Sequence, residues 1–213
     1  MRRPTVLLAD DHRIVAEGLK RLLGDEFDLV AMVENGREMV AAARQLRPEV
    51  VVADIAMPHL NGLDALVQLQ KLNPSPRVVF LTMHRDVAYA RRAFEGGAAG
   101  FVLKHAASDE LIMAIRAALD GRTFITPALA GEVLESLQRH PHAGGDPLSR
   151  LSPRQREILQ LLAEGRSAKE IGATLGISSR TVEFHKYQMM ESLRVDSNAE
   201  LIRLAVKHGL VTI

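Results

Sequence analysis

The sequence predicts two folded domains in tandem, an α/β domain with a parallel sheet followed by an all-α domain. As far as about residue 119, five short apolar runs alternate with five stretches of helical periodicity, which is the pattern of β-α units. From residue 150 onward the periodicity is only helical. Residues 140–147 lie between the two regions and contain two prolines, a glycine pair and almost nothing to bury, so we expect a linker there.

The apolar runs are short and rich in β-branched residues, as buried parallel strands are. Because crossovers between parallel strands are right-handed, few arrangements remain, and at this size the flavodoxin-like strand order 2-1-3-4-5 is the natural one. We expect strands at 5–9, 29–33, 50–53, 78–81 and 100–103, and helices at 12–23, 36–46, 61–72, 86–96 and 108–119.

The second region predicts a four-helix domain that contains a helix-turn-helix. Capping boxes, a serine followed three residues later by Gln or Glu, begin at Ser152, Ser167 and Ser197. A further helix begins near Ser178 and runs to about residue 193, and Gly176 marks a tight turn before it. We therefore expect a first domain over 1–121, a linker over 122–149 with a helix at 127–138, and a second domain over 150–213.

Composition and charge narrow the functional classes. The chain has 213 residues and no cysteine, which excludes disulfides, thiolate catalysis and cysteine-ligated zinc. No apolar run approaches the ~20 residues of a membrane span, and Asp10-Asp11 interrupts the first run too early for a signal peptide. We therefore expect a cytoplasmic protein without a membrane partner. Residues 148–213 carry 10 Lys and Arg against 7 Asp and Glu, which suits a polyanionic partner.

Polar residues stand where four of the predicted strands end. Asp10 and Asp11 follow the first strand, Asp54 the third, Thr82 the fourth and Lys104 the fifth. The strand order brings these ends together at one edge of the sheet. Three carboxylates there would repel one another without a cation, and oxygen ligands without cysteine favour Mg²⁺. Such a set suits phosphoryl transfer, in which Asp54 attacks a phosphoryl donor while Lys104 and Thr82 contact the phosphoryl oxygens.

Each of these residues taken singly also has a purely structural interpretation. Asp10-Asp11 could cap a helix, Lys104 could be a solvated surface residue, and Thr82 could be an ordinary β-branched residue. Their joint occurrence at the ends of strands favours the phosphoryl-transfer site.

Residues 4–120 resemble the receiver domain of bacterial two-component response regulators. The resemblance is carried by Asp10-Asp11, by Asp54 followed by Pro58 and Gly62, and by Thr82 and Lys104. It implies phosphorylation of Asp54 by a partner sensor histidine kinase.

The same resemblance assigns further roles. It implies that Asp11 ligates Mg²⁺ directly, that Asp10 acts through water, and that Asp54 and the carbonyl of Ala56 complete the protein ligands. It also implies that Thr82 and the aromatic residue three positions before the lysine, Phe101, form a switch pair.

Two residues depart from the usual receiver pattern. His105 stands after the lysine where many receivers have proline, and the large Met83 follows Thr82 where the residue is often small.

The tail resembles LuxR-type DNA-binding domains over about residues 150–211. The resemblance is carried by residues 151–165, by Lys169 to Ser178 and by Arg180 to His185. A receiver followed by this tail is similar to response regulators of the NarL/FixJ type.

Specific residues of the tail are candidates for contacts with double-stranded DNA. A recognition helix reads the major groove with its N-terminal half, which nominates Glu183, Phe184, Lys186 and Tyr187 for base edges. Helix N-termini and basic side chains suit phosphate contacts, and these candidates are Lys169, Ser178, Ser179, Arg180, Thr181 and Arg194. In the resemblance the last helix is the dimer contact, which assigns Leu201, Leu204 and Ala205 to dimerisation.

The sequence thus predicts a phosphorylation-controlled transcription regulator that pairs as a homodimer when phosphorylated and is not itself an enzyme. A constitutive DNA binder, whose receiver serves only protein contacts, is the alternative that Met83 and His105 leave open. A haloacid-dehalogenase-type phosphatase is disfavoured, because that family needs an Asp-x-Asp motif and His12 stands two residues after Asp10.

Overall fold

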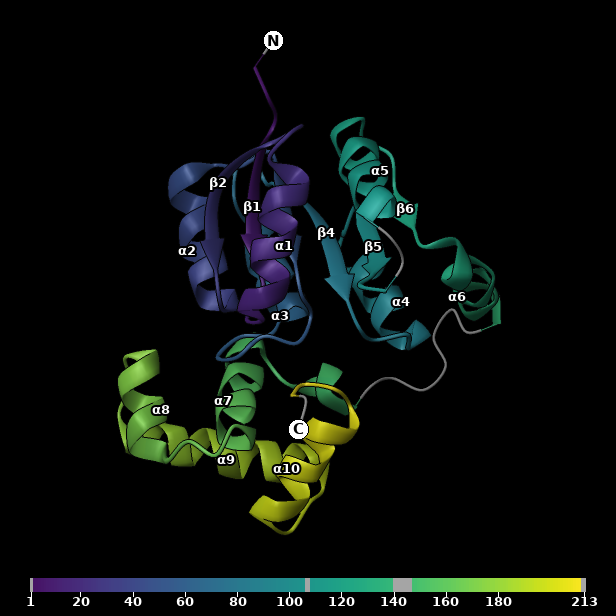
Figure 1. The fold of residues 1–213 in the computed structure, drawn as a ribbon. Coiled ribbons are helices and arrows are strands. Elements are labelled where there is room, and N and C mark those ends of the chain that lie inside the picture. The colour runs from purple at the N-terminus through teal and green to yellow at the C-terminus, as the bar shows by residue number, and fades with distance from the viewer. Residues whose placement is uncertain (1, 106–107, 140–146, 212–213) are drawn as a thin grey trace. The chain divides into compact units, whose positions relative to one another are not determined.

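The computed structural model describes residues 2–105, 108–139 and 147–211, and the chain divides into two compact units. The division falls within residues 140–146, so the linker expected there lies outside the described residues. Figure 1 shows the order of the elements along the chain. None of the helices in the described ranges has the length and apolarity that a membrane crossing requires.

The first unit is built on a parallel sheet of six strands in the order β2-β1-β3-β4-β5-β6. The order predicted for the first five strands is confirmed. The strands are β1 (Thr5–Ala9), β2 (Asp28–Val33), β3 (Val50–Ala53), β4 (Arg77–Thr82), β5 (Gly100–Leu103) and β6 (Phe124–Ile125).

Three helices of this unit, α2, α3 and α4, begin at a residue whose side chain caps them. Asn35, Asn61 and Asp86 each accept a hydrogen bond from a backbone N–H in the first turn that follows them. The helices are α1 (Arg13–Leu23), α2 (Gly36–Leu46), α3 (Gly62–Leu69), α4 (Val87–Glu95), α5 (Ser108–Leu119) and α6 (Pro127–Arg139).

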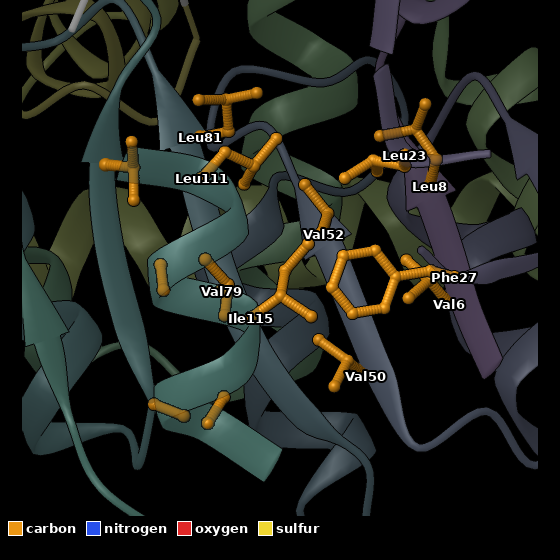
Figure 2. Packing of buried hydrophobic residues seen from close by; sticks show 14 of the residues in the cluster. Val6, Leu8, Leu23, Phe27, Val50, Val52, Val79, Leu81, Leu111 and Ile115 are labelled. Atoms are coloured by element: carbon orange, nitrogen blue, oxygen red, sulfur yellow. The ribbon is translucent and has the colours of Figure 1, made fainter. Parts of the chain in front are cut away.

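The sheet is buried on both faces. Every second strand residue packs with α1 and α5 in one continuous core, so these two helices cover one face, as Figures 1 and 2 show. The opposite face contacts α2, α3 and α4. Residues of the first core that are labelled in Figure 2 are Val6, Leu8, Leu23, Phe27, Val50, Val52, Val79, Leu81, Leu111 and Ile115.

The sixth strand and α6 lie in the segment that we expected as a linker. Phe124 N–H donates to the Ala99 carbonyl at 3.0 Å and Thr126 N–H to the Phe101 carbonyl at 3.0 Å, so β6 extends the sheet beyond β5. The helix expected at 127–138 is α6, which packs against α4. The described residues from 122 to 139 therefore belong to the first unit, and the sheet has one strand more than predicted.

The second unit is helical. It consists of the short 3-10 helix η1 (Pro147–Arg150) and of α7 (Pro153–Ala163), α8 (Ala168–Leu175), α9 (Ser179–Leu193) and α10 (Asn198–Lys207). Both bonds of the predicted capping boxes form at Ser152 and Ser167. At Ser197 only the serine bond forms as predicted, because the Glu200 carboxylate accepts instead from Asp196 N–H at 2.9 Å.

The turn between α8 and α9 depends on two glycines. Gly176 ends α8 with φ +67°, a conformation that costs glycine little. A Cβ on Gly172 would lie 2.7 Å from the Ile177 carbonyl oxygen, so the absence of a side chain lets the turn pack directly on α8. These features produce the helix-turn-helix that the sequence predicts.

Candidate functional site

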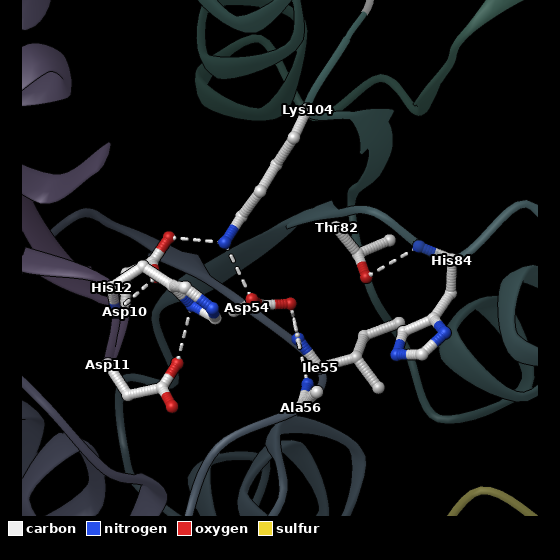
Figure 3. Close-up of polar contacts among 9 residues, drawn as sticks. All are labelled: Asp10, Asp11, His12, Asp54, Ile55, Ala56, Thr82, His84 and Lys104. Atoms are coloured by element: carbon white, nitrogen blue, oxygen red, sulfur yellow. Dashed lines mark hydrogen bonds and ion pairs between the residues drawn. The ribbon is translucent and has the colours of Figure 1, made fainter. Parts of the chain in front are cut away.

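Four of the predicted residues lie at the carboxyl ends of parallel strands. Asp10, Asp54 and Lys104 directly follow β1, β3 and β5, and Thr82 is the last residue of β4. Asp54 N–H donates to the Ala9 carbonyl at 2.8 Å, and Lys104 N–H donates to the Thr82 carbonyl at 2.8 Å. The sheet ladder thus continues to the first residue after β3 and after β5. As a result, the side chains of Asp10, Asp54, Thr82 and Lys104 meet at the carboxyl edge of the sheet (Figure 3).

A buried ion-pair network forms the centre of this site. Lys104 Nζ lies 2.6 Å from Asp54 Oδ2 and 2.7 Å from Asp10 Oδ2, and all three side chains are at most 6% exposed. Burial alone would lower the pKa of Lys104, but its attraction to Asp54 and its contacts with Asp10 outweigh that effect and raise the pKa. One ammonium group is therefore held charged between two carboxylates.

The Asp54 carboxylate is oriented by the backbone as well. Its Oδ1 accepts from Ile55 N–H at 2.6 Å, with Ala56 N–H farther away at 3.4 Å. A Cβ on Gly62 would lie 2.3 Å from the Asp54 carbonyl oxygen, so only glycine lets α3 begin this close to the strand end. The local chain thus fixes Oδ1 and leaves Oδ2 toward Lys104 and the centre of the site.

Asp11 completes a cluster of metal-ligating groups with Asp10, His12 and Asp54, whose ligand atoms lie within 4.8 Å of one another. Partial burial, together with repulsion from Asp54 and Asp10, raises the pKa of Asp11 despite the opposing effect of His12. A bound cation would reduce the repulsion between these carboxylates. Their oxygen atoms are the ligands that a hard ion such as Mg²⁺ prefers. The Ala56 carbonyl, the fourth predicted ligand, follows two residues after Asp54 in the same loop.

His12 belongs to this cluster although we did not expect it there from the sequence. The ring Nδ1 of His12 lies 2.9 Å from Asp11 Oδ1 and 3.3 Å from Asp10 Oδ1. The backbone N–H of His12 donates to Asp10 Oδ1 at 2.9 Å. Its position directly after the acidic pair was the available signal.

The predicted switch residues are both fully buried. Thr82 and Phe101 are 0% exposed. The Thr82 hydroxyl oxygen accepts from His84 N–H at 3.2 Å. Met83, which directly follows Thr82, is 67% exposed, so its long side chain points away from the core.

In the second unit the predicted DNA contacts gather on α9 and at its start. Phe184 and Tyr187 are 59% and 65% exposed, which is unusual for large aromatic residues. Lys186 forms an ion pair with Glu183, and its Nζ lies 5.3 Å from the centre of the Tyr187 ring. The remaining candidates lie at the first turns of α8 and α9 or at the end of α9, and these are Lys169, Ser178, Ser179, Arg180, Thr181 and Arg194.

Two of those candidates already contact each other. The Ser178 Oγ accepts from Thr181 N–H at 3.1 Å and lies 2.8 Å from Thr181 Oγ1. Ser178 is therefore the N-cap of α9, and a phosphate contact would use the exposed backbone and neighbouring side chains of that turn.

The residues predicted for dimerisation do not form one exposed surface. Leu201 and Ala205 are 0% exposed and belong to the core of the second unit, where α10 packs on α7 and α9. Leu204 is half-buried. The apolar stripe of α10 is therefore used for packing inside its own unit, and a dimer contact on this helix stays a prediction.

Comparisons with known proteins support both halves of this description. Residues 6–116 match the family of response regulator receiver domains, and residues 149–205 match the LuxR family of bacterial regulatory proteins. The transcriptional regulatory protein MctR of Rhizobium johnstonii is 39% identical over 97% of this chain and 95% of its own length. The transcriptional regulatory protein UhpA of Escherichia coli is 37% identical over 93% of this chain and 96% of its own.

Solved structures of response regulators are similar to this chain over nearly its whole length. RcsB of Salmonella typhimurium has a TM-score of 0.64 and 26% identity, covering 98% of this chain and 99% of RcsB. A complex of RcsB with DNA has a TM-score of 0.58 and 27% identity, covering 95% and 98%. Together with the acidic edge of the sheet and the exposed helix of the second unit, these similarities establish that the chain belongs to the LuxR-type response regulators, which join a receiver domain to a helix-turn-helix DNA-binding domain and act in phosphorylation-controlled transcription.

Proposed function

We propose that Asp54 is the phosphoacceptor of this response regulator and that its phosphorylation controls DNA binding by the second unit. The observation that carries the proposal is the ion-pair network in which Lys104 joins Asp54 and Asp10 at the sheet edge. A purely structural lysine would not need two buried carboxylates, since burying unpaired or excess charge is costly.

The chemistry is an in-line displacement at phosphorus. A carboxylate oxygen of Asp54 forms a new O–P bond while the N–P bond to the imidazole of a phosphorylated sensor histidine kinase breaks. The backbone N–H of Ile55 holds Oδ1, which favours attack by Oδ2. In the unphosphorylated chain Lys104 contacts Asp54 Oδ2. From this position it can pair with an oxygen of the incoming phosphoryl group and neutralise part of that group's charge.

A bound Mg²⁺ would be held by Asp10, Asp11, Asp54 and the carbonyl of Ala56, and it would supply positive charge to the transferring group. The neighbouring acidic residues already repel one another, which is the physical reason that the site should favour this ion. This is a binding role for the chain, and we assign it no enzymatic reaction on another substrate.

The switch would begin at Thr82. Its hydroxyl accepts from His84 N–H, and on phosphorylation it would turn to donate to a phosphoryl oxygen. Phe101 lies buried on the adjacent strand, so a shift of Thr82 changes the space against which this ring packs. We infer that this repacking alters the surface of the receiver.

The second unit would bind promoter DNA as a homodimer, with α9 in the major groove. Exposed Phe184 and Tyr187 offer apolar contacts to base edges, and the Glu183 and Lys186 pair offers an acceptor and a donor. A solved structure of two RcsB dimers on two parallel DNAs supports a dimer by analogy. Because Leu201 and Ala205 are internal, a dimer contact on α10 would use half-buried Leu204 and its neighbours. We place the protein in the cytoplasm, where kinase and DNA meet.

The test is intact-mass measurement after incubation with acetyl phosphate and Mg²⁺. The native chain should gain one phosphoryl group, while Asp54→Asn should gain none and Asp25→Asn, an exposed aspartate on the same unit, should behave like the native chain. DNA fragments selected from a random pool by the treated native chain then serve as the binding probe. Equal adducts on native and Asp54→Asn chains would refute the role of Asp54, and equal DNA binding with and without phosphorylation would favour a constitutive binder.

A further inference from the structure

The end of β5 is held by a side chain from outside the receiver match. The Thr126 hydroxyl oxygen accepts from Leu103 N–H at 3.1 Å and donates to Glu110 Oε2 of α5 at 2.7 Å. Thr126 is 1% exposed, and it follows β6, ten residues after the end of the receiver match at residue 116. A hydroxyl has one proton, so when it accepts from Leu103 and donates to Glu110 both of its roles are used.

This contact takes the place of a backbone hydrogen bond between β5 and β6. The outer edge of β5 is paired by Phe124 N–H to the Ala99 carbonyl and by Thr126 N–H to the Phe101 carbonyl. β6 is only two residues long and ends there, which would leave the buried Leu103 N–H without a strand partner. The Thr126 hydroxyl supplies the acceptor that a longer strand would have supplied, and an unpaired buried N–H is costly.

Leu103 directly precedes the lysine of the site. Leu103 N–H is fixed on the β6 side by Thr126, and the next N–H, that of Lys104, is fixed on the β4 side by the Thr82 carbonyl at 2.8 Å. The two consecutive amides therefore clamp the backbone from opposite sides just where the Lys104 side chain leaves the sheet. From there its Nζ reaches Asp54 and Asp10.

We propose that Thr126 is a positioning residue for Lys104, which makes the β6 extension part of the phosphorylation machinery. This rests on the proposed role of Asp54 and Lys104. Removing the hydroxyl frees one side of the clamp, so Lys104 samples positions from which it contacts the incoming phosphoryl group less well. The carboxylates that would hold the metal follow β1 and β3, whereas the hydrogen bonds of the Thr126 hydroxyl join it to Leu103 and Glu110. Since Lys104 competes with a cation for these carboxylates, loosening it should not weaken their affinity for metal.

The experiment uses the full chain with the substitutions Thr126→Val, Thr126→Ser and Thr123→Val. Thr126→Val keeps the shape and removes the hydroxyl, whereas Thr126→Ser keeps the hydroxyl. Thr123→Val makes the same chemical change at an exposed threonine three residues earlier. Two quantities are measured on each, the initial rate of adduct formation with acetyl phosphate and the Mg²⁺ dissociation constant by calorimetry.

We expect Thr126→Val to slow adduct formation by roughly three- to tenfold, the range that one lost hydrogen bond produces. The Mg²⁺ dissociation constant should not rise by more than about twofold, and Thr126→Ser and Thr123→Val should keep the native rate. The proposal would be overturned if Thr126→Val reacted at the native rate, or if its Mg²⁺ affinity fell by the same factor as its rate. It would also be overturned if Thr126→Ser did not keep the native rate. If the native chain itself forms no adduct, it is the role of Asp54 that fails, and the positioning role with it.

Discussion

Replacing Lys104 by methionine tests the electrostatic description of the site most directly. The substitution keeps an unbranched side chain of similar length and removes only the ammonium group. Asp10 and Asp54, whose side chains are 2% and 4% exposed, then lose the cation that lies 2.7 and 2.6 Å away. Two buried carboxylates remain facing each other with Asp11 nearby.

The expected loss follows from the cost of breaking a buried ion pair. Removal of one partner typically destabilises a protein by about 3–5 kcal/mol, and here two carboxylates lose the same partner, which favours the upper part of that range. The free energy of unfolding of a domain of this size is about 5–15 kcal/mol in total, so we expect the variant still to fold. Because the pKa of Lys104 is raised above 10.5 in the folded chain, its contribution is fully present at pH 7 and is lost only at a more alkaline pH.

The measurement must report on the first unit alone. Native-state hydrogen exchange of the Val51 and Val52 amides in β3, which are fully buried, does so without Mg²⁺ present. We expect exchange to accelerate by roughly a hundredfold to several thousandfold, the equivalent of about 3–5 kcal/mol. Lys20→Met, which removes an exposed lysine from α1, is the control.

Magnesium provides the second half of the same prediction. Lys104 and a divalent cation compete for the same carboxylates, so Mg²⁺ should restore much of the lost stability and should bind the variant more tightly than the native chain. An ion at about 100 times its dissociation constant contributes about 2.7 kcal/mol. An acceleration below tenfold, or a loss that Mg²⁺ does not reduce, would refute the description of Lys104 as the counter-ion of this site.

Three further predictions concern other parts of the chain. Asp11→Asn should raise the stability of the metal-free chain at pH 7, because the folded state raises the pKa of Asp11; urea titrations should show the gain vanishing below about pH 3.8, where aspartate is protonated in both states. Gly62→Ala should destabilise the first unit by about 1–3 kcal/mol and slow adduct formation, since the new Cβ would press on the Asp54 carbonyl; an unchanged melting curve would contradict this. Phe184→Ala should change stability by less than about 0.5 kcal/mol, because the ring is exposed, yet weaken binding to selected DNA in mobility-shift assays; native affinity would remove the ring from the interface.

The sequence predicted the fold well because its signals are repeated and local. Each of the first five strands is an apolar run, each of the helices that follow has its own periodicity, and the capping serines at 152 and 167 form the expected bonds. β6 was missed for a physical reason. Two residues, Phe124 and Ile125, are too few to show a period, and they pair with β5 only because the edge of that strand is free to accept them.

The site was predictable to the extent that it lies at strand ends. Asp10, Asp54, Thr82 and Lys104 each follow or end an apolar run, and the parallel topology brings them together without any further information. Thr126 has no such signal, because its partners Leu103 and Glu110 lie 23 and 16 positions away and its role depends on where β6 happens to stop.

The last helix shows why an apolar stripe identifies burial but not the partner that causes it. Leu201, Leu204 and Ala205 were assigned to a dimer contact, and two of them instead complete the core of their own unit. A unit of about 65 residues has little apolar surface to spare, so it needs the stripe of α10 for its own stability. A dimer contact on this helix would therefore have to use the side chains that the core of the unit leaves at least partly exposed, such as half-buried Leu204.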